Sequence, residues 1–571
     1  MALVLLLFFG LMVPSTAPVA KPELIILSLI DDLGFADIRP NGPWSPTPHI
    51  GALAAQGVQL RHLHAYKYCS PSRRSLLSGR FPVHINGQQA PPCSNFLPLQ
   101  LTLLSQKLKL AGYSTHFIGK GHLGYQTTDH LPINRGFDTH VGYLLGMENY
   151  AHGLQAMCDV PNLFGLPDAC PEPHPCVGRW PPRQPADKCH LDYWQNNSTA
   201  PRSVLESQRY STETFAAEMV RLIEAKAVDT PMFVYLGWQA VHGPWTSPPA
   251  DLGLLAEDDP NYANYCSSDP QPVPPNGCDE ETATTACTQV MRCQFGSVLK
   301  VLDNALANIT AALTQKALWE DTLMLVSADN GGVGPGNNWP LRGQKTTPWQ
   351  GGTRVAAFLT GGFIPKRLRG TSFDRLTHFA DVYPTLCNLV GVSAVDTVVV
   401  QGEPRAIDGV DFWPLLLSNA STVLREYLPT TEVSIIWRER YKLITSAGVG
   451  GSYWAPPEGK TPSNTVININ RTEWPCVNTN ATAACLICSP EKPCLFDLSQ
   501  DEAERVNLAP QQPQLVAQLA RQLATYTAYV DGKMASEELA GYDCVSPAYP
   551  SEFWGNFTGP CCKPKHPRAH P

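Results

Sequence analysis

The chain has 571 residues, of which 43% are hydrophobic and 16% charged, and its formal net charge is -8. This composition is typical of folded globular proteins and excludes an intrinsically disordered chain. The mild negative charge also argues against a nucleic-acid-binding protein, which normally carries a basic face. From the length alone we expect about two to four domains.

Residues 1–20 have the pattern of a signal peptide. The apolar stretch over 1–13 is too short to span a bilayer comfortably, and small residues follow it up to Ala20. The alternative, a membrane anchor, is less favoured for that reason, and no other segment is apolar enough for stable membrane insertion. We therefore expect cleavage between Ala17 and Ala20 and a secreted or lysosomal protein.

The 18 cysteines support a secretory route, because disulfides persist there and not in the cytosol. Their connectivity cannot be deduced from spacing. Cys485 and Cys488 are compatible with a redox or zinc pair, but no matching Cys/His pair follows them, so disulfides are favoured. Cys387, in a helical-looking segment, is our candidate for a buried free thiol. The main clusters are Cys158, Cys170, Cys176 and Cys189; Cys266, Cys278, Cys287 and Cys293; Cys476, Cys485, Cys488 and Cys494; and Cys544, Cys561 and Cys562.

Glycosylation sequons are also consistent with the secretory pathway. Each has Ser or Thr two residues after the asparagine and no intervening proline. They begin at Asn196, Asn197, Asn308, Asn419, Asn470, Asn480 and Asn556.

Four apolar runs have the length of buried strands. They cover 24–30, 115–118, 232–238 and 322–328, and a polar or glycine-rich segment follows each of them. Continuous apolar runs are typical of strands that are buried on both faces, as in a parallel sheet. Helical spacing between the runs predicts helices over 101–111, 211–227 and 298–313.

This alternation predicts an α/β fold with a large mixed, mostly parallel sheet sandwiched by helices. Ligands of such sheets bind beyond the carboxyl ends of the strands, where the polar segments of this chain fall.

The pattern changes near residue 426. Short strands around 435–444 and 495–498 and a helix over 514–529 predict a smaller C-terminal α+β domain over 426–571, after a larger domain over 21–425. Segments 158–189 and 250–290 are predicted to be long insertion loops.

Paired oxygen-bearing side chains follow two of the predicted strands. Asp31 and Asp32 come directly after the first run, and Asp329 and Asn330 after the last. Adjacent carboxylates repel each other unless a cation or a shared proton relieves them. An all-oxygen set suits Ca²⁺ or Mg²⁺. The alternative is that each pair only caps a turn, but two such pairs at strand ends favour a metal site.

Cys69 is a candidate nucleophile. Ser70 could cap a helix with Pro71 in its first turn, and a thiol at a helix N-terminus has a lowered pKa. Arg73 would then lie on the first turn, close enough to stabilise an anion. The alternatives for Cys69 are half of a disulfide or a small buried side chain.

Cationic or basic residues are associated with the same strand ends. Each one alone is usually a surface or packing residue. Together they form a cluster suited to a tetrahedral anion such as sulfate or phosphate. These residues are Lys120, His122, His242 and Lys345.

Two longer strings resemble the signatures of the type I sulfatases, which belong to the alkaline-phosphatase-like superfamily. They are CSPSRRSLLSGR over 69–80 and GYSTHFIGKGHLG over 112–124. The resemblance runs from about residue 23 into the C-terminal domain and looks closest to the arylsulfatase B (N-acetylgalactosamine-4-sulfatase) group. Further matching strings are RGFDT at 135–139, GYLLG at 142–146, NNWPLRGQK at 337–345, GGTR at 351–354, DGVDFW at 408–413 and LFDL at 495–498.

The resemblance implies a hydrolase of sulfate monoesters, with sulfated sugars or glycosaminoglycans as candidate substrates. It implies that a formylglycine-generating enzyme oxidises Cys69 to formylglycine (3-oxoalanine) during synthesis. One hydroxyl of the hydrated aldehyde would attack sulfur, and the second would later allow sulfate to be expelled. A phosphate or phosphonate monoester hydrolase and a non-catalytic protein that binds sulfated glycans remain alternatives.

Site roles follow from the resemblance, position by position. Asp31, Asp32, Asp329 and Asn330 resemble the ligands of one Ca²⁺, which the modified Cys69 also contacts. Arg73 resembles the residue that supports the formylglycine, and His122 the partner of its hydroxyls. Lys120 and Lys345 resemble sulfate-binding residues, and His242 the substrate-binding proton donor to the leaving oxygen.

The chain departs from the family pattern at three positions. Gly121 stands where the family usually has Trp, Gln344 where it has Gly or Arg, and Gln350 where it has Glu. None of these changes removes a reactive group from the site. We expect them to alter pocket shape and substrate choice rather than catalysis.

Overall fold

The computed structural model describes most of the chain from residue 21 onward. The residues left undescribed are 1–20, 43–44, 86–95, 147, 149, 151–191, 200–209, most of 244–284, 397–398, 401–402, 405, 419, 448–485, 529–541, 545–561 and 565–571. The expected signal peptide and the insertion loop over 158–189 lie outside the described residues, as does most of the loop over 250–290. No helix of the described part is long and apolar enough to cross a membrane.

A ten-stranded sheet forms the centre of the molecule, in the order β11-β2-β10-β9-β1-β8-β4-β5-β6-β7. Its middle strands β9, β1, β8, β4 and β5 run parallel, whereas β10 and the edge strands β6 and β7 pair antiparallel. The expected mostly parallel sheet is confirmed. In chain order the strands are β1 (Leu24–Ile30), β2 (Val58–Leu60), β4 (Ser114–Lys120), β5 (Thr139–Tyr143), β6 (Trp194–Gln195), β7 (Ser198–Thr199), β8 (Met232–Gly237), β9 (Thr322–Ala328), β10 (Ala357–Thr360) and β11 (Thr371–Phe373).

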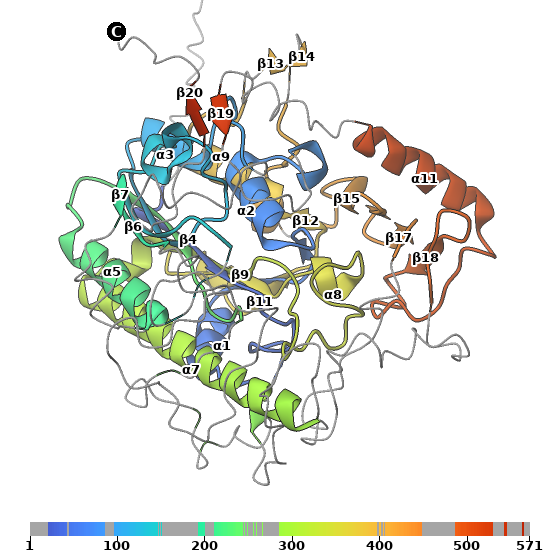
Figure 1. Ribbon diagram of the computed structural model, residues 1–571, viewed down its shortest axis with the longest axis horizontal. Helices are drawn as coiled ribbons and strands as arrows, with labels where there is room; N and C mark the ends of the chain where they lie inside the picture. Colours follow the sequence, from blue (N-terminus) through green and yellow to red (C-terminus); the bar gives the residue numbers. More distant parts are fainter. Residues whose placement is uncertain are drawn as a thin grey trace, which may run out of the picture.

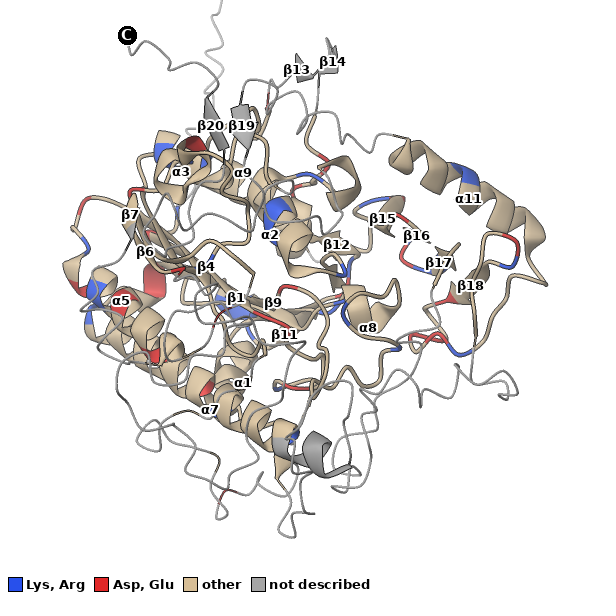
Figure 2. Cartoon of the chain, viewed as in Figure 1, with Lys and Arg blue, Asp and Glu red and all other residues tan. Residues whose placement is uncertain are grey.

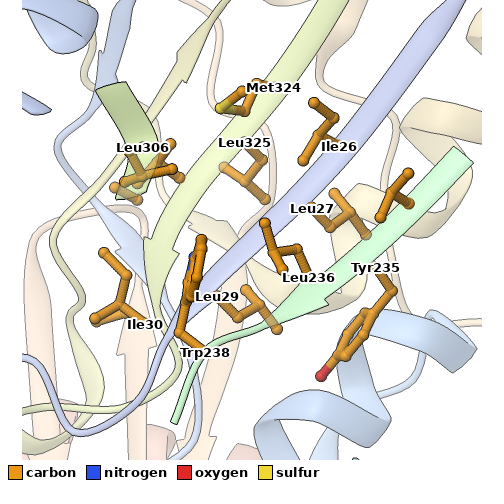
Figure 3. Packing of buried hydrophobic residues seen from close by; sticks show 14 of the residues in the cluster. Ile26, Leu27, Leu29, Ile30, Tyr235, Leu236, Trp238, Leu306, Met324 and Leu325 are labelled. Atoms are coloured by element: carbon orange, nitrogen blue, oxygen red, sulfur yellow. The ribbon is translucent and has the colours of Figure 1, made fainter. Parts of the chain in front are cut away.

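The apolar composition of β1 explains its central position. All seven of its residues are buried, and Leu24 aligns with Met232 of β8 and Thr322 of β9. Its side chains pack against both neighbouring strands (Figure 3). A strand that is apolar on both faces is stable only between two helical layers.

Helices cover both faces of the sheet (Figure 1). One layer contains α1 (Pro48–Ala55), α5 (Ser211–Ala225) and α7 (Thr285–Gln315), and the other contains α2 (Cys69–Ser78), α3 (Leu104–Leu110) and α9 (Phe379–Val390). The predicted helices over 101–111 and 211–227 correspond to α3 and α5. The helix predicted over 298–313 is longer and begins at Thr285. Shorter elements are α8 (Gln350–Thr353), α10 (Trp413–Ser418) and the paired strands β3 (Leu63–His64) with β12 (Thr377–His378), β13 (Val399–Val400) with β14 (Glu403–Pro404), and β19 (Tyr542–Cys544) with β20 (Cys562–Pro564).

The C-terminal part contains the expected short antiparallel sheet. Its strands follow chain order as β15 (Tyr427–Thr431), β16 (Ser434–Trp437), β17 (Tyr441–Ile444) and β18 (Cys494–Asp497). Helix α11 (Pro513–Thr527) packs Leu519 and Leu523 against one face of this sheet. Lys, Arg, Asp and Glu are interspersed along α5 and around β15 to β18, as a mild net charge would suggest (Figure 2).

Glu504 forms a buried ion pair within the C-terminal part and also bonds residues that precede this part in the chain. Lys442 Nζ of β17 lies 2.8 Å from Glu504 Oε1, and both side chains are 0% exposed. Glu504 Oε2 accepts the backbone N–H of Gln350, and the Glu504 carbonyl accepts a hydrogen bond from Arg342. Gln350 begins α8, so the pair anchors the segment that carries Lys345.

Two disulfides and two free thiols are described. Cys266 is bonded to Cys293, and Cys488 to Cys494. A redox or zinc pair of Cys485 with Cys488 is therefore wrong, because Cys488 is already bonded to another cysteine. The predicted free thiol Cys387 is confirmed and lies buried in α9, and the other free cysteine of the described part is Cys69.

The described sequon asparagines are accessible. Asn196 and Asn197 are exposed in the turn between β6 and β7, and Asn308 is exposed on α7. Asn419, Asn470, Asn480 and Asn556 lie outside the described residues.

Replacing Lys442 with Met should destabilise the fold by about 3–5 kcal/mol, because Glu504 would be left as a buried unpaired charge. The midpoint of urea unfolding, followed by tryptophan fluorescence, measures the loss. Lys492→Met is the control: Lys492 is exposed, and such changes stay within about 0.5 kcal/mol. A loss for Lys442→Met no larger than the control's would contradict the anchoring role.

Candidate active site

The carboxyl ends of four parallel strands bring the expected site residues together. Asp31 and Asp32 follow β1, Asp329 and Asn330 follow β9, and Lys120 is the last residue of β4. His242 lies on the segment after β8, where the Tyr150 hydroxyl donates to its backbone carbonyl over 2.9 Å. The expectation of one polar cluster at this edge of the sheet is confirmed.

The four oxygen-bearing side chains are buried and close together. The Asp32 N–H points to Asp329 Oδ1 at 3.3 Å, and Asn330 Nδ2 donates to Asp32 Oδ1 over 2.8 Å. Within the described residues, Asp31 Oδ1 and Asn330 Oδ1 accept no hydrogen bond although both are buried. A backbone φ of +55° holds Asp32 in the left-handed region, a strained conformation typical of functional sites.

This oxygen set fits a divalent cation. Burial raises the pKa of Asp31 well above its usual range, and the charge of Asp329 raises it further. One oxygen atom each of Asp31 and Asp329 lies with Cys69 Sγ in a group whose atoms are all within 4.8 Å of one another. A bound cation would give the unpaired buried oxygens a partner, and it would offset the repulsion that Asp329 exerts on the ionised Asp31.

Cations within the chain already offset part of this negative charge. Arg73 Nε donates to Asp329 Oδ2 over 2.8 Å, and its Nη1 reaches the Tyr235 hydroxyl at 3.2 Å and the Lys120 carbonyl at 3.1 Å. Lys120 forms a buried ion pair with Asp31 Oδ2. Both cations therefore hold the carboxylates in place, and the hydrogen bond of Arg73 to Asp329 directs its guanidinium toward the oxygen set rather than toward solvent.

Cys69 is the first residue of α2, and Tyr68 is its N-cap. The prediction that Ser70 caps the helix is wrong, because its hydroxyl donates instead to the His122 carbonyl over 2.7 Å. Pro71 lies in the first turn, as expected. Cys69 Sγ is 3.1 Å from His122 Nδ1, which places the histidine directly beside the candidate nucleophile.

The prediction of a lowered thiol pKa is also wrong. Burial raises the pKa of Cys69, and the charges of Lys120 and Lys345 offset this only in part. Desolvation disfavours the thiolate most, and the nearby Asp31 and Asp329 carboxylates disfavour it further. Cys69 as a thiol is therefore neutral and a weak nucleophile at neutral pH.

Lys345 and His242 form a second pair beside Asp32. Lys345 Nζ lies 2.6 Å from Asp32 Oδ1 and 3.3 Å from His242 Nε2. Burial opposes ionisation of Asp32, but Lys345 and then His242 hold its pKa below the usual range. His242 Nδ1 is 2.6 Å from the Gly243 carbonyl, which can only accept, so Nδ1 carries the proton and Nε2 is free to accept one.

Both histidines of the site are neutral at ordinary pH. Burial lowers the pKa of His242 to about 3, with Lys345 acting in the same direction and Asp32 opposing. Burial and the charge of Lys120 lower the pKa of His122 well below its ordinary value. A neutral imidazole has one nitrogen free to accept a proton, and an anion bound nearby raises its pKa and favours that protonation.

Some partners of the site have no motif of their own in the sequence. Tyr235 lies in the apolar run of β8, and only the structure shows that its hydroxyl meets Arg73. Gly146 touches His122, since a Cβ there would stand 2.5 Å from His122 Cε1. Glu432 reaches Lys67 from the C-terminal sheet, a contact across 365 residues of sequence.

A model of the sulfatase family matches residues 23–392 of this chain. The chain belongs to the sulfatase family. Among curated relatives, mouse arylsulfatase J is 29% identical over 539 residues, which are 90% of this chain and 77% of that protein. Human arylsulfatase A is 27% identical over 506 residues, covering 86% of this chain and 84% of the relative.

Solved structures show the same fold. The crystal structure of Ps i-CgsB superposes with a TM-score of 0.62 at 21% identity, over 91% of this chain and 97% of that one. The PsFucS1 sulfatase from Pseudoalteromonas sp. superposes with a TM-score of 0.58 at 20% identity, over 90% and 91%. These structures show that the chain has the alkaline-phosphatase-like sulfatase fold. The family match and the arylsulfatase relatives show that this sulfatase hydrolyses sulfate esters. Its grouping with arylsulfatase B stays a prediction.

The thiol form of Cys69, made in a host without the modifying enzyme, should react slowly with iodoacetamide at pH 7. Its folded pKa lies above the ordinary value, so the thiolate fraction and the rate should keep rising with pH beyond about 8.5. The mass of the Cys69 peptide against time gives the rate, and the protein unfolded in guanidinium is the reference. A rate that levels off near pH 7 would contradict the raised pKa.

Proposed function

We propose that this sulfatase cleaves sulfate monoesters of phenols or sugars with a formylglycine made from Cys69 and one Ca²⁺ per chain. The observation that carries the proposal is the position of Cys69 Sγ, which lies with one oxygen each of Asp31 and Asp329 in a group whose atoms are all within 4.8 Å of one another, and 3.1 Å from His122 Nδ1. Lys120 and Lys345 add positive charge on the same side. Such an arrangement suits an anionic tetrahedral group beside a metal-assisted nucleophile.

Four residues would hold the Ca²⁺: Asp31, Asp32, Asp329 and Asn330. Asp31 Oδ1 and Asn330 Oδ1, which are buried and have no donor in the part of the chain that the structure describes, support this assignment. An oxygen-only set prefers Ca²⁺ or Mg²⁺ over zinc. Bound Ca²⁺ would supply positive charge to the sulfuryl oxygens and to the oxygen of the modified Cys69. Arg73 keeps the Asp329 carboxylate in place for this role.

The raised pKa of Cys69 supports the need for modification, since the thiol itself is a poor nucleophile. Hydrated formylglycine would supply two hydroxyl groups, one for attack on sulfur and one for the later release of sulfate. His122, beside Cys69 and neutral, is placed to accept a proton from such a hydroxyl. A formylglycine-generating enzyme is therefore a partner during synthesis.

His242 and Lys345 would act on the leaving group. Lys345 binds a sulfuryl oxygen and holds His242 Nε2 at 3.3 Å. The sulfate ester is an anion, so its arrival raises the low pKa of His242 and favours protonation of Nε2. The imidazolium then protonates the departing oxygen.

The cellular route and domain division are part of the proposal. Two disulfides and exposed sequon asparagines support passage through the secretory pathway, to a secreted or lysosomal destination. We assign catalysis to residues 21–425 and treat 426–571 as the smaller domain, which is tied to α8 by Glu504.

Replacing Cys69 with Ala should lower turnover of 4-nitrophenyl sulfate on the order of 10⁴-fold or more, because no nucleophile remains. Cys387→Ala removes the other described free thiol and should stay near wild type. The mass of the wild-type Cys69 peptide should show an aldehyde in place of the thiol. Full activity of Cys69→Ala, or a strong preference for 4-nitrophenyl phosphate over the sulfate, would overturn the proposed function.

Replacing His242 with Ala should cost about 10²–10⁴-fold with an alkyl sulfate, whose leaving alcohol needs a proton. The loss should be much smaller with 4-nitrophenyl sulfate. Because the pKa of free His242 is about 3, the wild-type kcat/KM for the alkyl sulfate should rise as the pH falls from neutrality. His49→Ala, at an exposed histidine, is the control. Equal losses with both substrates would argue against a proton-donor role.

A further inference from the structure

Three half-buried residues lie beside the nucleophile and have no part in the chemistry proposed above. Lys67 and Tyr68 immediately precede Cys69, and Glu432 lies in the turn between β15 and β16. We call these three residues the rim. The larger domain contributes two of them and the C-terminal sheet the third.

The rim is a connected structure. Lys67 Nζ forms an ion pair with Glu432 Oε1, and the buried Tyr66 hydroxyl donates to Glu432 Oε2 over 2.5 Å. The Lys67 side chain is 12% exposed and that of Glu432 37%, so solvent still reaches both. Lys67 Nζ also lies 5.7 and 5.9 Å from the ring centres of Tyr66 and Tyr68.

The rim adjoins the residues that would bind sulfate. The Thr346 N–H donates to the Lys67 carbonyl over 2.8 Å, which fixes the rim against the segment carrying Lys345. Burial raises the pKa of the Tyr68 hydroxyl, the charge of Glu432 raises it further and that of Lys345 lowers it, so both charges act on Tyr68. Cys69 is only 3% exposed, and the half-buried Lys67 and Tyr68 directly precede it, so the rim is a surface beside the nucleophile that the alcohol part of a bound ester can contact.

The chemistry of the rim matches neutral hydroxyl groups. Lys67 and Glu432 cancel each other's charge but keep spare donor and acceptor capacity, because an ammonium has three N–H donors and a carboxylate about four acceptor sites. A hydroxyl can accept from Lys67 and donate to Glu432. A second sulfate or a uronate carboxylate could accept from Lys67 but has no proton to donate to Glu432, and a plain phenyl ring offers neither a donor nor an acceptor. The Tyr68 ring adds an apolar surface for the C–H face of a sugar.

We propose that the rim binds the alcohol part of the substrate, and that this part is a neutral sugar ring with free hydroxyl groups next to the sulfate ester. The proposal rests on the sulfatase function proposed above and adds a substrate class to it. It also gives the C-terminal sheet a role in specificity through Glu432.

The test compares kcat/KM for galactose and N-acetylgalactosamine monosulfates with kcat/KM for 4-nitrophenyl sulfate. Glu432→Gln should lower the ratio of sugar to aryl rate by about tenfold or more, chiefly through KM, because a hydrogen bond to a charged group is lost from binding. Tyr68→Ala should lower the same ratio, whereas Tyr68→Phe keeps the ring and should retain most of it.

Glu426→Gln is the matched control, because Glu426 is an exposed carboxylate just before β15 that pairs only with Arg438 among the ion pairs described. Its ratio should equal that of the wild type. The mass of the Cys69 peptide is measured in each variant, since Tyr68 adjoins the modified residue.

Equal losses with sugar and aryl substrates would show that the rim only supports the fold and would overturn the proposal. No loss in Glu432→Gln, no turnover of any sugar monosulfate by a wild type active on the aryl sulfate, or a preference for uronate-bearing or doubly sulfated sugars would also overturn it. If the wild type hydrolyses neither class, the proposed function fails. Calorimetry of sugar monosulfate binding to the wild type and to Glu432→Gln then tests separately whether the rim binds the sugar: weaker binding to the variant supports the proposal and equal binding overturns it.

Discussion

The site depends on three carboxylates buried side by side at the end of a sheet. Asp31, Asp32 and Asp329 lie at the ends of adjacent strands β1 and β9, where little water can reach them. Buried like charges are tolerated only with matching cations and hydrogen bonds. Arg73, Lys120 and Lys345 supply part of that match, and the two oxygens that have no donor among the described residues mark where a metal would supply the rest.

The parallel sheet brings the catalytic residues together around these carboxylates. Each strand ends at the same edge, so residues far apart in sequence meet without long loops. The first turn of α2 then places Cys69 against the carboxylates, and His122 against Cys69. Glu504, which is paired with Lys442 of the C-terminal sheet, accepts the Gln350 N–H at the start of α8 and so supports the segment that carries Lys345.

Much of this was predictable from sequence, and the exceptions have physical reasons. The apolar runs of β1, β8 and β9 predict their strands because burial on both faces leaves a continuous pattern. The local pattern around Ser70 predicts a helix cap, but the Ser70 hydroxyl instead donates a tertiary hydrogen bond to the His122 carbonyl. The thiol pKa depends on burial, which no local pattern reports. Tyr235 contacts Arg73 across 162 residues of sequence, and Glu432 contacts Tyr66 across 366. Neither Tyr235 nor Glu432 lies in a motif.

The metal content of the purified protein tests the central claim most directly. After dialysis against metal-free buffer, elemental analysis should find about one Ca²⁺ per chain, as expected for a single oxygen-rich site. Asp329→Asn should lose that ion, while Asp374→Asn, at an exposed carboxylate paired with Arg61, should keep it. A wild-type protein that carries zinc, or that keeps full sulfatase activity with no bound divalent cation, would contradict the account.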